Sequence, residues 1–523
     1  MGAKPKRSQL KQATLLGLIS LFDFGSTYIY DIPSSLEWVF RSKLGLSSPQ
    51  SLLLYSAYSL PNLVVNILGG LLILRLGYTR CLRIYSVCVT LGQVLFAVGV
   101  SSQAYPIMLL GRFMVGCGAE NLMITQYYSS HQTFDAGYVT FAIGINQCFT
   151  YLASFVGFYL VPYSYLISES LEVAVWSTTL APAISLCAVL VFTYVKDIED
   201  QEQKNREVIS SQETELKIDL RPTVAEGLEE ETRAIKSSHS GHSIDTFEEY
   251  TPNLRHKSPN KEVQDPELMA ITTTNGTNPG TQHSFDLTEN TDCSTPDSKA
   301  ANQPADEELF DIRTFQWTDL EKFPTIFWYL CLLPLTVSCA YFQFTNICTS
   351  LIQTKFELEY SESKNIPTVF PLTLLILLPF LSKLAEKHGR RAFYLVASSL
   401  LGIVTYVFLY ICDEDDQWAK IPLMTMMGVF FALYCCVFWS AVTQVLPLPL
   451  VNIGLSIANT IQNLSNFIYP IFMGSILSQI TQASLQTFLW VLTVLLSVGF
   501  LVTLKISQLD YAGKKHLDRG DST

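Results

Sequence analysis

Long apolar runs separated by short polar segments are the dominant pattern of this sequence. A helix that crosses a bilayer needs about twenty mostly apolar residues, and the chain contains twelve such runs in two blocks of six. The runs of the first block are 13–36, 50–74, 81–101, 105–129, 137–161 and 173–195, and those of the second are 323–350, 365–386, 391–412, 420–446, 450–477 and 485–506. The pattern predicts an all-α membrane protein with twelve transmembrane helices in two six-helix bundles.

The stretch between the two blocks differs in composition. Residues 196–322 hold 28 of the 46 acidic residues of the chain and 13 of its 34 basic residues. They are rich in polar residues and lack apolar periodicity, so they cannot bury enough surface to offset the entropy of ordering. We expect an N-terminal bundle at 1–195, a disordered acidic linker at 196–322, a C-terminal bundle at 323–506 and a tail at 507–523.

The distribution of Lys and Arg predicts the orientation in the membrane. Basic residues concentrate in the cytosolic segments that flank transmembrane helices. If both termini are cytosolic, fifteen Lys and Arg residues flank the inner segments and five flank the outer loops. The sequence therefore predicts cytosolic termini and a cytosolic linker.

Two tight basic loops occupy equivalent places in the two blocks. One covers residues 70–80 and the other 386–391, and both carry a glycine among basic residues. They resemble the Gly-x-x-x-Asp-Arg-x-Gly-Arg-Arg signature of the major facilitator superfamily. The second loop keeps an acid, Glu386, before Arg390, whereas the first has Leu74 at the position of the aspartate. Ordinary positive-inside loops are the alternative interpretation. With the six-plus-six pattern, the resemblance implies the major facilitator fold and alternating access between two bundles.

Further segments resemble one branch of that superfamily, the lysosomal dipeptide uniporters. These segments are Phe24-Gly25-Ser26, Tyr30-Asp31-x-Pro33, Leu54-Tyr55-x-x-Tyr58-Ser59-x-Pro61-Asn62, Gly111-Arg112-Phe113, Gly116-x-Gly118-x-Glu120, Trp439 and Ile461-Gln462-Asn463-Leu464. The resemblance implies a multi-pass protein of a lysosomal or vacuolar membrane, rather than of the plasma membrane, and a substrate site that contains Glu120. It also implies a heavily glycosylated accessory membrane protein as a partner. The chain departs from the family at Tyr151, where animal members carry an arginine suited to a peptide carboxylate.

Ionisable residues inside the predicted helices are candidate functional groups because burying charge in a bilayer is expensive. Asp23, Arg112 and Glu120 lie deep in the first block, and Asp31 lies near the outer end of the first helix. We assign Asp23, Asp31 and Arg112, with Glu386 and Arg390, to ion pairs or gating. Arg112 precedes Glu120 by eight residues, about 12 Å along a helix, so each needs another partner. For Arg112, a neighbouring helix end and Asp31 are the structural alternatives to a role in transport. For Glu120 the alternative is a protonated carboxyl bonded to a facing helix.

Polar and aromatic residues suited to a cavity recur on several predicted helices. These residues are Tyr28, Tyr30, Tyr58, Gln126, Tyr127, Gln147, Tyr151, Gln343, Asn346, Trp439, Gln462 and Asn463. We select Glu120, Tyr151, Tyr30, Gln126, Gln147, Gln343, Trp439, Gln462 and Asn463 as substrate-binding candidates. The same side chains could instead form hydrogen bonds between helices.

The motifs of other function classes are absent from the sequence. It contains no phosphate-binding loop, nucleophile elbow or spaced metal ligands, so we expect no enzyme activity, no cofactor, no metal and no nucleic-acid partner. We expect a transporter that contacts membrane lipid and carries a small molecule, a dipeptide or another amine-bearing solute, as a uniporter. A proton-coupled sugar or organic-solute carrier and a membrane scaffold without transport remain the alternatives.

Overall fold

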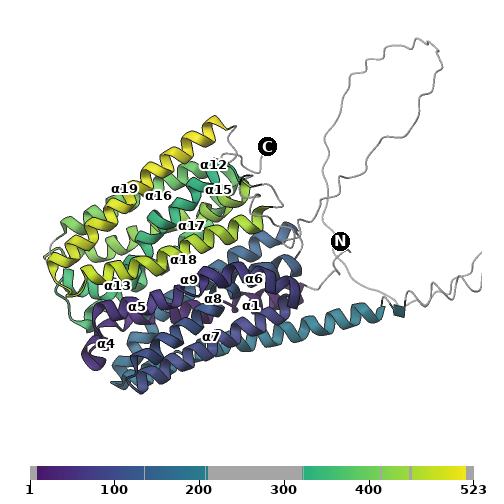
Figure 1. Cartoon of the computed structure of the whole chain (residues 1–523), viewed down its shortest axis with the longest axis horizontal. Coiled ribbons are helices and arrows are strands. Elements are labelled where there is room, and N and C mark those ends of the chain that lie inside the picture. The colour runs from purple at the N-terminus through teal and green to yellow at the C-terminus, as the bar shows by residue number, and fades with distance from the viewer. Residues whose placement is uncertain are drawn as a thin grey trace, which may run out of the picture. The chain divides into compact units, whose positions relative to one another are not determined.

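The computed structural model describes residues 9–134, 136–206, 208–209, 321, 323–412, 415–446, 450–513 and 517. Most of the predicted disordered linker and most of the tail predicted at 507–523 lie outside these residues. Within the described part, all regular secondary structure is helical. The long helices lie side by side, with the purple-to-teal first half next to the green-to-yellow second half (Figure 1).

The first six transmembrane segments are built from ten named helices and one continuation. The helices are α1 (Gln9–Ser20), α2 (Phe24–Tyr30), α3 (Ile32–Ser35), α4 (Glu37–Leu44), α5 (Ser48–Ser59), α6 (Asn62–Leu76), α7 (Tyr78–Ser101), α8 (Tyr105–Thr133), α9 (Ala136–Ser168) and α10 (Leu171–Ser177). The helical segment that begins with α10 continues to Arg206.

The second six segments contain a π-helical turn and two short 3₁₀ turns. Their elements are α12 (Thr325–Leu333), η3 (Pro334–Ser338), α13 (Cys339–Lys355), α14 (Tyr360–Ser363), η4 (Ile366–Thr368), α15 (Val369–His388), α16 (Arg391–Ile411), η5 (Gln417–Ala419), α17 (Lys420–Gln444), α18 (Val451–Ile476) and α19 (Gln482–Ala512).

Eleven helical segments of the described chain are long and apolar enough to cross a membrane. The twelfth predicted segment is α18, which has 26 residues but is more polar because Asn459, Gln462, Asn463 and Asn466 lie along it. Large apolar side chains such as Val64, Phe380 and Leu501 are more than half exposed, as expected of surfaces that face lipid. Twelve segments in two bundles confirm the predicted fold class.

The predicted limits of three helical segments are wrong. The first segment is interrupted at Asp23 and Asp31, where α2 begins and ends. The sixth segment extends to Arg206, so residues 196–206 are helical rather than disordered. Ion pairs anchor this extension, because Lys11 lies 2.8 Å from Glu199 and Arg83 lies 3.3 Å from Asp197. The last helix likewise continues past 506 into the predicted tail, to Ala512.

The two ends of the bundles are distinguished by their loops. The basic loops after α6 and α15 turn at Gly77 and Gly389, both at positive φ, where glycine avoids the strain of a side chain. We call their end the inner end, which is predicted to face the cytosol. The opposite end, where α4 lies (Figure 1), is the outer end, and Trp38 of α4 stacks there on Tyr360 of α14.

Glycines in α8 allow its neighbours to approach at backbone distance. A Cβ atom built on Gly116 would overlap the carbonyl oxygen of Tyr58, and one on Gly111 would lie 2.8 Å from the carbonyl oxygen of Gly92. Small residues that permit such approaches are typical of membrane helix interfaces. This packing brings α5 and α7 against α8, and it fixes the position of Glu120 of α8 relative to these two helices.

We expect Gly116→Ala to destabilise the protein strongly, because the added methyl group cannot be accommodated beside the backbone of α5. The melting temperature and monodispersity of the purified protein measure this effect. Gly144→Ala is the matched control, since nothing lies within 4 Å of the corresponding Cβ position in α9. Equal stability of the two variants would contradict the proposed packing.

Candidate functional site

Glu120 lies in the middle of α8 and contacts both bundles. Its carboxylate accepts hydrogen bonds from the Tyr58 hydroxyl of α5 at 3.4 Å and from the Asn459 amide of α18 at 3.5 Å. Asn459 in turn accepts a hydrogen bond at its carbonyl oxygen from Asn463, at 3.0 Å. Within the described residues, the ion pairs that the structure records leave Glu120 without a cationic partner. A deep carboxylate therefore has only neutral hydrogen-bond donors, both at long range.

Arg112 is fully buried and binds the end of a neighbouring helix. Its guanidinium donates to the carbonyl oxygens of Ile29 at 3.0 Å and Tyr30 at 3.1 Å, at the C-terminal end of α2. The guanidinium carbon also lies 5.4 to 5.8 Å from the ring centroids of Tyr30, Tyr55 and Tyr58. Helix C-termini and aromatic faces both attract cations. This geometry corresponds to the helix-end alternative for Arg112.

The two aspartates of the first segment lie at its interruptions. Asp23 precedes α2 and accepts hydrogen bonds from the hydroxyls of Ser26 and, at 3.2 Å, Thr27. Asp31 follows α2 and accepts one from Ser154 of α9 at 2.6 Å. Both side chains are buried. Asp23 and Asp31 therefore flank the two ends of α2, and their recorded hydrogen bonds stay within the first bundle.

Tyr30 and Tyr151, two of the predicted substrate-binding residues, contact the second bundle. The Tyr30 ring packs edge-on against Tyr58, at 5.0 Å, and against Phe342 of α13, at 6.4 Å. The Tyr151 hydroxyl of α9 donates to the sulfur of Cys435 in α17 at 3.4 Å. Gln147, one turn earlier, donates to the Tyr127 hydroxyl. The structure thus gathers Glu120, Tyr30 and Asn463 in one group and Gln147 and Tyr151 in a second.

Other predicted residues have different surroundings. The Gln126 amide donates to the carbonyl oxygen of Ile19 at 2.7 Å, where α1 ends. Gln343 is fully buried, and neither end of its amide has a hydrogen-bond partner. Trp439 packs edge-on against Phe438 at 4.9 Å. Gln462, on α18, is partly buried.

The predicted gating residues of the second basic loop lie at the inner end, away from Glu120. Arg390 is exposed, with φ of 54°, and Glu386 is partly buried near the end of α15. The next residue, Arg391, is buried and donates from Nε to the Ser440 hydroxyl of α17 at 3.3 Å. Arg391 thus links α16 to α17, a role that the motif alone did not assign.

Sequence reasoning missed Asn459, the Glu120 partner on the second bundle. Asn459 and Asn463 are four residues apart, so they lie on one face of α18. This four-residue spacing is the sequence signal that could have placed Asn459 beside the predicted site residue Asn463. Within the described residues, His, Cys, Asp and Glu side chains form no group that could hold a metal ion.

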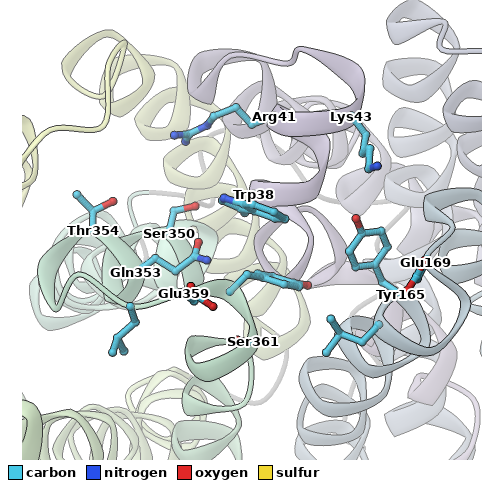
Figure 2. A pocket seen from close by; sticks show the side chains of 13 residues that line it. Trp38, Arg41, Lys43, Tyr165, Glu169, Ser350, Gln353, Thr354, Glu359 and Ser361 are labelled. Carbon is cyan, nitrogen blue, oxygen red and sulfur yellow. The ribbon is translucent and has the colours of Figure 1, made fainter.

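A cavity of about 780 Å³ opens between the bundles at the outer end. Trp38 and Arg41 line it from α4, Tyr165 from α9, and Ser350 and Gln353 from α13 (Figure 2). None of the predicted site residues lines this cavity.

Contacts beside the cavity join the two bundles. The Ser34 hydroxyl donates to the carbonyl oxygen of Thr345 at 2.6 Å, and the Tyr360 hydroxyl donates to that of Ser35 at 3.0 Å. The Trp38 ring stacks on Tyr360 at 5.3 Å. We call these five residues the outer gate; in this structure their contacts join the two bundles at the outer end.

The sequence model of the Major Facilitator Superfamily matches residues 14–275 and 325–521. The chain belongs to this superfamily. Because the match includes both bundles, the six-plus-six arrangement is that of a major facilitator superfamily transporter.

Relatives within the superfamily share part of the sequence. The lysosomal dipeptide transporter MFSD1 of Mus musculus is 31% identical over 183 residues, which are 35% of this chain and 39% of that protein. The protein of the same name from Homo sapiens is 32% identical over 33% of this chain and 38% of its own length. The chain therefore spans well under half of these relatives. The chicken protein, from Gallus gallus, matches 88% of this chain and 78% of its own length at 18% identity.

Solved structures share the fold of this superfamily member at low sequence identity. A peptide transporter POT in complex with sulfate superposes with a TM-score of 0.59 at 11% identity, covering 98% of each chain. The nucleoside transporter NupG superposes with a TM-score of 0.54 at 11% identity, covering 96% of this chain and 99% of its own.

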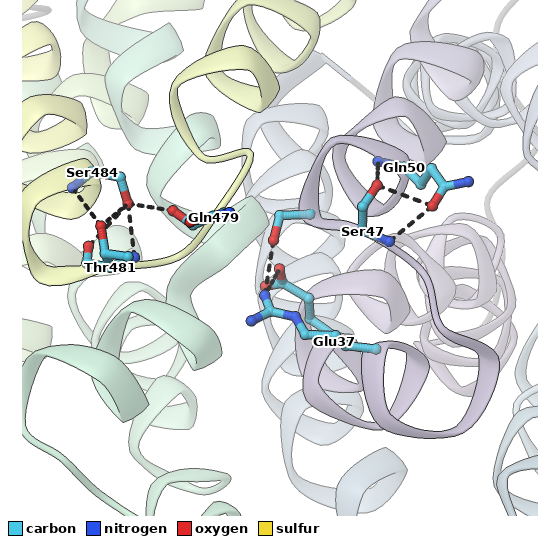
Figure 3. Close-up of polar contacts among 8 residues, drawn as sticks. Glu37, Ser47, Gln50, Gln479, Thr481 and Ser484 are labelled. Carbon is cyan, nitrogen blue, oxygen red and sulfur yellow. Dashed lines mark hydrogen bonds and ion pairs between the residues drawn. The ribbon is translucent and has the colours of Figure 1, made fainter.

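The buried carboxylate of Glu37 lies next to the outer gate and binds Arg41. Glu37 of α4 is almost fully buried and accepts a hydrogen bond from Arg41 at 3.2 Å, while Arg41 also donates to Ser48 at 2.9 Å (Figure 3). Burial raises the pKa of Glu37 above its ordinary value, and hydrogen bonds from Ser350, Arg41 and Ser48 oppose part of the effect.

We expect Glu37→Gln to raise the melting temperature at about pH 8 and to change it little at about pH 4. The raised pKa means that the folded state retains the Glu37 proton to higher pH than the unfolded state. Its stabilising contribution is therefore present below the ordinary Glu pKa of about 4.3 and is lost as the pH rises through the folded value. Glu362→Gln, at an exposed carboxylate in α14, is the control. A rise of equal size at both pH values would contradict this interpretation.

Proposed function

We propose that this chain is an alternating-access uniporter for dipeptides or other amine-bearing small solutes. The observation that carries the proposal is the environment of Glu120, a carboxylate between the bundles whose described hydrogen-bond partners are neutral. A deep carboxylate is stabilised when a cation replaces its lost solvation. The protonated amine of a substrate is such a cation.

The contacts of Glu120 explain how substrate binding would couple to movement. Tyr58 belongs to the first bundle and Asn459 to the second. Both hydrogen bonds to Glu120 are long, at 3.4 and 3.5 Å. An ammonium group forms shorter, charge-assisted hydrogen bonds and would displace the Asn459 amide. The substrate then becomes the link between α8 and α18, and it leaves when the bundles rock apart.

The opposite end of the substrate would lie near Tyr151 and Cys435. Tyr151 joins the bundles through its hydroxyl, and it occupies the position at which the dipeptide uniporters carry arginine. A tyrosine offers one neutral donor where an arginine offers a charged fork. We therefore propose that this chain accepts substrates whose carboxylate end is amidated, neutral or bound by another group.

The proposed setting is a lysosome-like membrane. The relatives are named lysosomal dipeptide transporters, and the likeness in sequence supports the same compartment. The two Asn-x-Ser/Thr sequons, Asn275-Gly-Thr277 and Asn463-Leu-Ser465, lie in the predicted cytosolic linker and in α18. Neither position is suited to glycosylation from the lumen. A glycosylated accessory membrane protein would shield the outer loops.

We expect Glu120→Gln to reduce uptake of an amine-bearing dipeptide at least tenfold, because the neutral amide cannot compensate an ammonium group. Glu120→Asp should retain partial uptake, since it keeps the charge. The measurement is uptake of alanyl-alanine into proteoliposomes, normalised to reconstituted protein, with Glu172→Gln at the outer end as the control for loss of one carboxylate. If Gln is tolerated better than Asp, Glu120 has only a structural role.

We expect Tyr151→Arg to increase uptake of dipeptides with a free carboxylate relative to the same dipeptides amidated at the C-terminus. The arginine would supply the charged fork that tyrosine lacks. The ratio of the two uptake rates is the measurement, and Tyr151→Phe is the matched control. Strong dipeptide uptake by the unmodified protein that Tyr151→Phe leaves unchanged would show that this position does not read the carboxylate.

A further inference from the structure

The outer cavity carries charges of both signs on separate sides. Arg41 and Lys43 come from α4, whereas Glu169 follows α9 and Glu359 precedes α14. In the view of Figure 2 the two cations lie along one side of the cavity and the two acids on the other. The volume of about 780 Å³ falls within the range of about 300–1,000 Å³ that is usual for small-molecule sites.

Aromatic rings lie between the charged sides. Trp38 stacks on Tyr360 with an interplanar angle of 15°, and Tyr165 meets Tyr360 edge-on at 6.2 Å. Trp38 and Tyr360 also belong to the outer gate, so the cavity borders it. A molecule in the cavity would contact both bundles while the contacts of the gate are in place.

Arg41 is held in place before any ligand arrives. Glu37 and Ser48 accept hydrogen bonds from the same terminal nitrogen, while the Nε of Arg41 is buried and has no hydrogen-bond partner. On the other side, Glu169 directly follows α9, and its amide donates to the carbonyl oxygen of Tyr165 at 2.8 Å. Its positive φ of 52° is the left-handed conformation that commonly ends a helix. The backbone of Glu169 is therefore fixed by the end of α9, as the side chain of Arg41 is fixed by Glu37 and Ser48.

We propose that this cavity is a loading site for zwitterionic solutes. Arg41 and Lys43 bind the carboxylate of the solute, and Glu359 and Glu169 bind its ammonium group, above the outer gate. The inference rests on the proposed function, because the loaded solute is the one that later reaches Glu120. Separation of Trp38 from Tyr360 opens the path between the two sites.

The test uses three probes that carry different terminal charges: alanyl-alanine, its N-acetyl derivative and its C-terminal amide. Binding is measured by the change in tryptophan fluorescence of the full-length purified protein, and Trp38→Phe identifies the part of the signal that comes from the cavity. Lys43→Gln and Glu359→Gln are the test variants because both side chains are exposed and lie outside the Glu37–Arg41 contact. Lys364→Gln and Glu362→Gln, which remove the same charges nearby without lining the cavity, are the matched controls.

We expect each test variant to raise the apparent dissociation constant for alanyl-alanine about three- to fivefold, the usual effect of one exposed ion pair. Lys43→Gln should leave binding of the amide unchanged, because that probe has no carboxylate. Glu359→Gln should leave binding of the N-acetyl derivative unchanged, because that probe has no ammonium group. A merely structural role would weaken all three probes equally.

The outcomes separate this site from the proposed function. No Trp38-dependent signal in the unmodified protein, or test variants that behave like their controls, would overturn the loading site even if uptake of alanyl-alanine is normal. A charge-selective signal without uptake of either alanyl-alanine or its C-terminal amide would overturn the proposed function and leave the loading site in place.

Discussion

The buried guanidinium of Arg112 organises the first bundle. A cation at this depth is stable only if its hydration is replaced, and the replacement consists of the end of α2 and three tyrosine rings. These partners come from α2 and α5, so one side chain of α8 ties three helices together. Tyr58, fixed by this arrangement, also donates to one of the two carboxylate oxygens of Glu120. The position of the central carboxylate therefore depends on the cation eight residues before it.

The interruptions of the first segment follow from the same constraint. A helix end inside a bilayer leaves backbone groups that water cannot reach. Here Arg112 donates hydrogen bonds to the final carbonyl groups of α2, and Gln126 donates one to the carbonyl oxygen of Ile19 near the end of α1. The two long polar residues of α8 thus allow α1 and α2 to end in the membrane. This explains why Gln126, which resembles a cavity residue in sequence, has a neighbouring backbone as its partner.

Apolar run lengths were sufficient to predict the twelve segments and their division, because a bilayer imposes a fixed length on each helix. They could not predict the interruptions at Asp23 and Asp31, since apolar residues continue through both. The helical extension at 196–206 was missed for the opposite reason. It is polar and largely exposed beyond Glu199, and ion pairs such as Lys11 with Glu199 leave no periodic signal.

The candidate site was predictable only in part. Glu120 and Arg112 are conspicuous as charges in apolar runs, and their spacing excluded a mutual ion pair. The partner across the bundles was not predictable, because which face of α18 meets α8 depends on tertiary packing. The outer cavity was harder still. Arg41 and Lys43 appear in sequence as ordinary loop charges, and Glu169 and Glu359 lie far from them along the chain. Only the fold brings the four together.

The same helices connect the outer gate to Glu120. Ser34 and Ser35 of the gate lie in α3, directly after the α2 end that Arg112 holds, and the Ser34 amide donates to the Tyr55 hydroxyl at 2.9 Å. Tyr55 is itself one of the rings around Arg112. A displacement of α3 that opens the gate must therefore move Tyr55 or break this hydrogen bond, and either change alters the surroundings of Arg112 and hence of Tyr58. Since Tyr58 donates to Glu120, the proposed opening at the outer end and the proposed ligand binding at the centre would act on one continuous set of contacts.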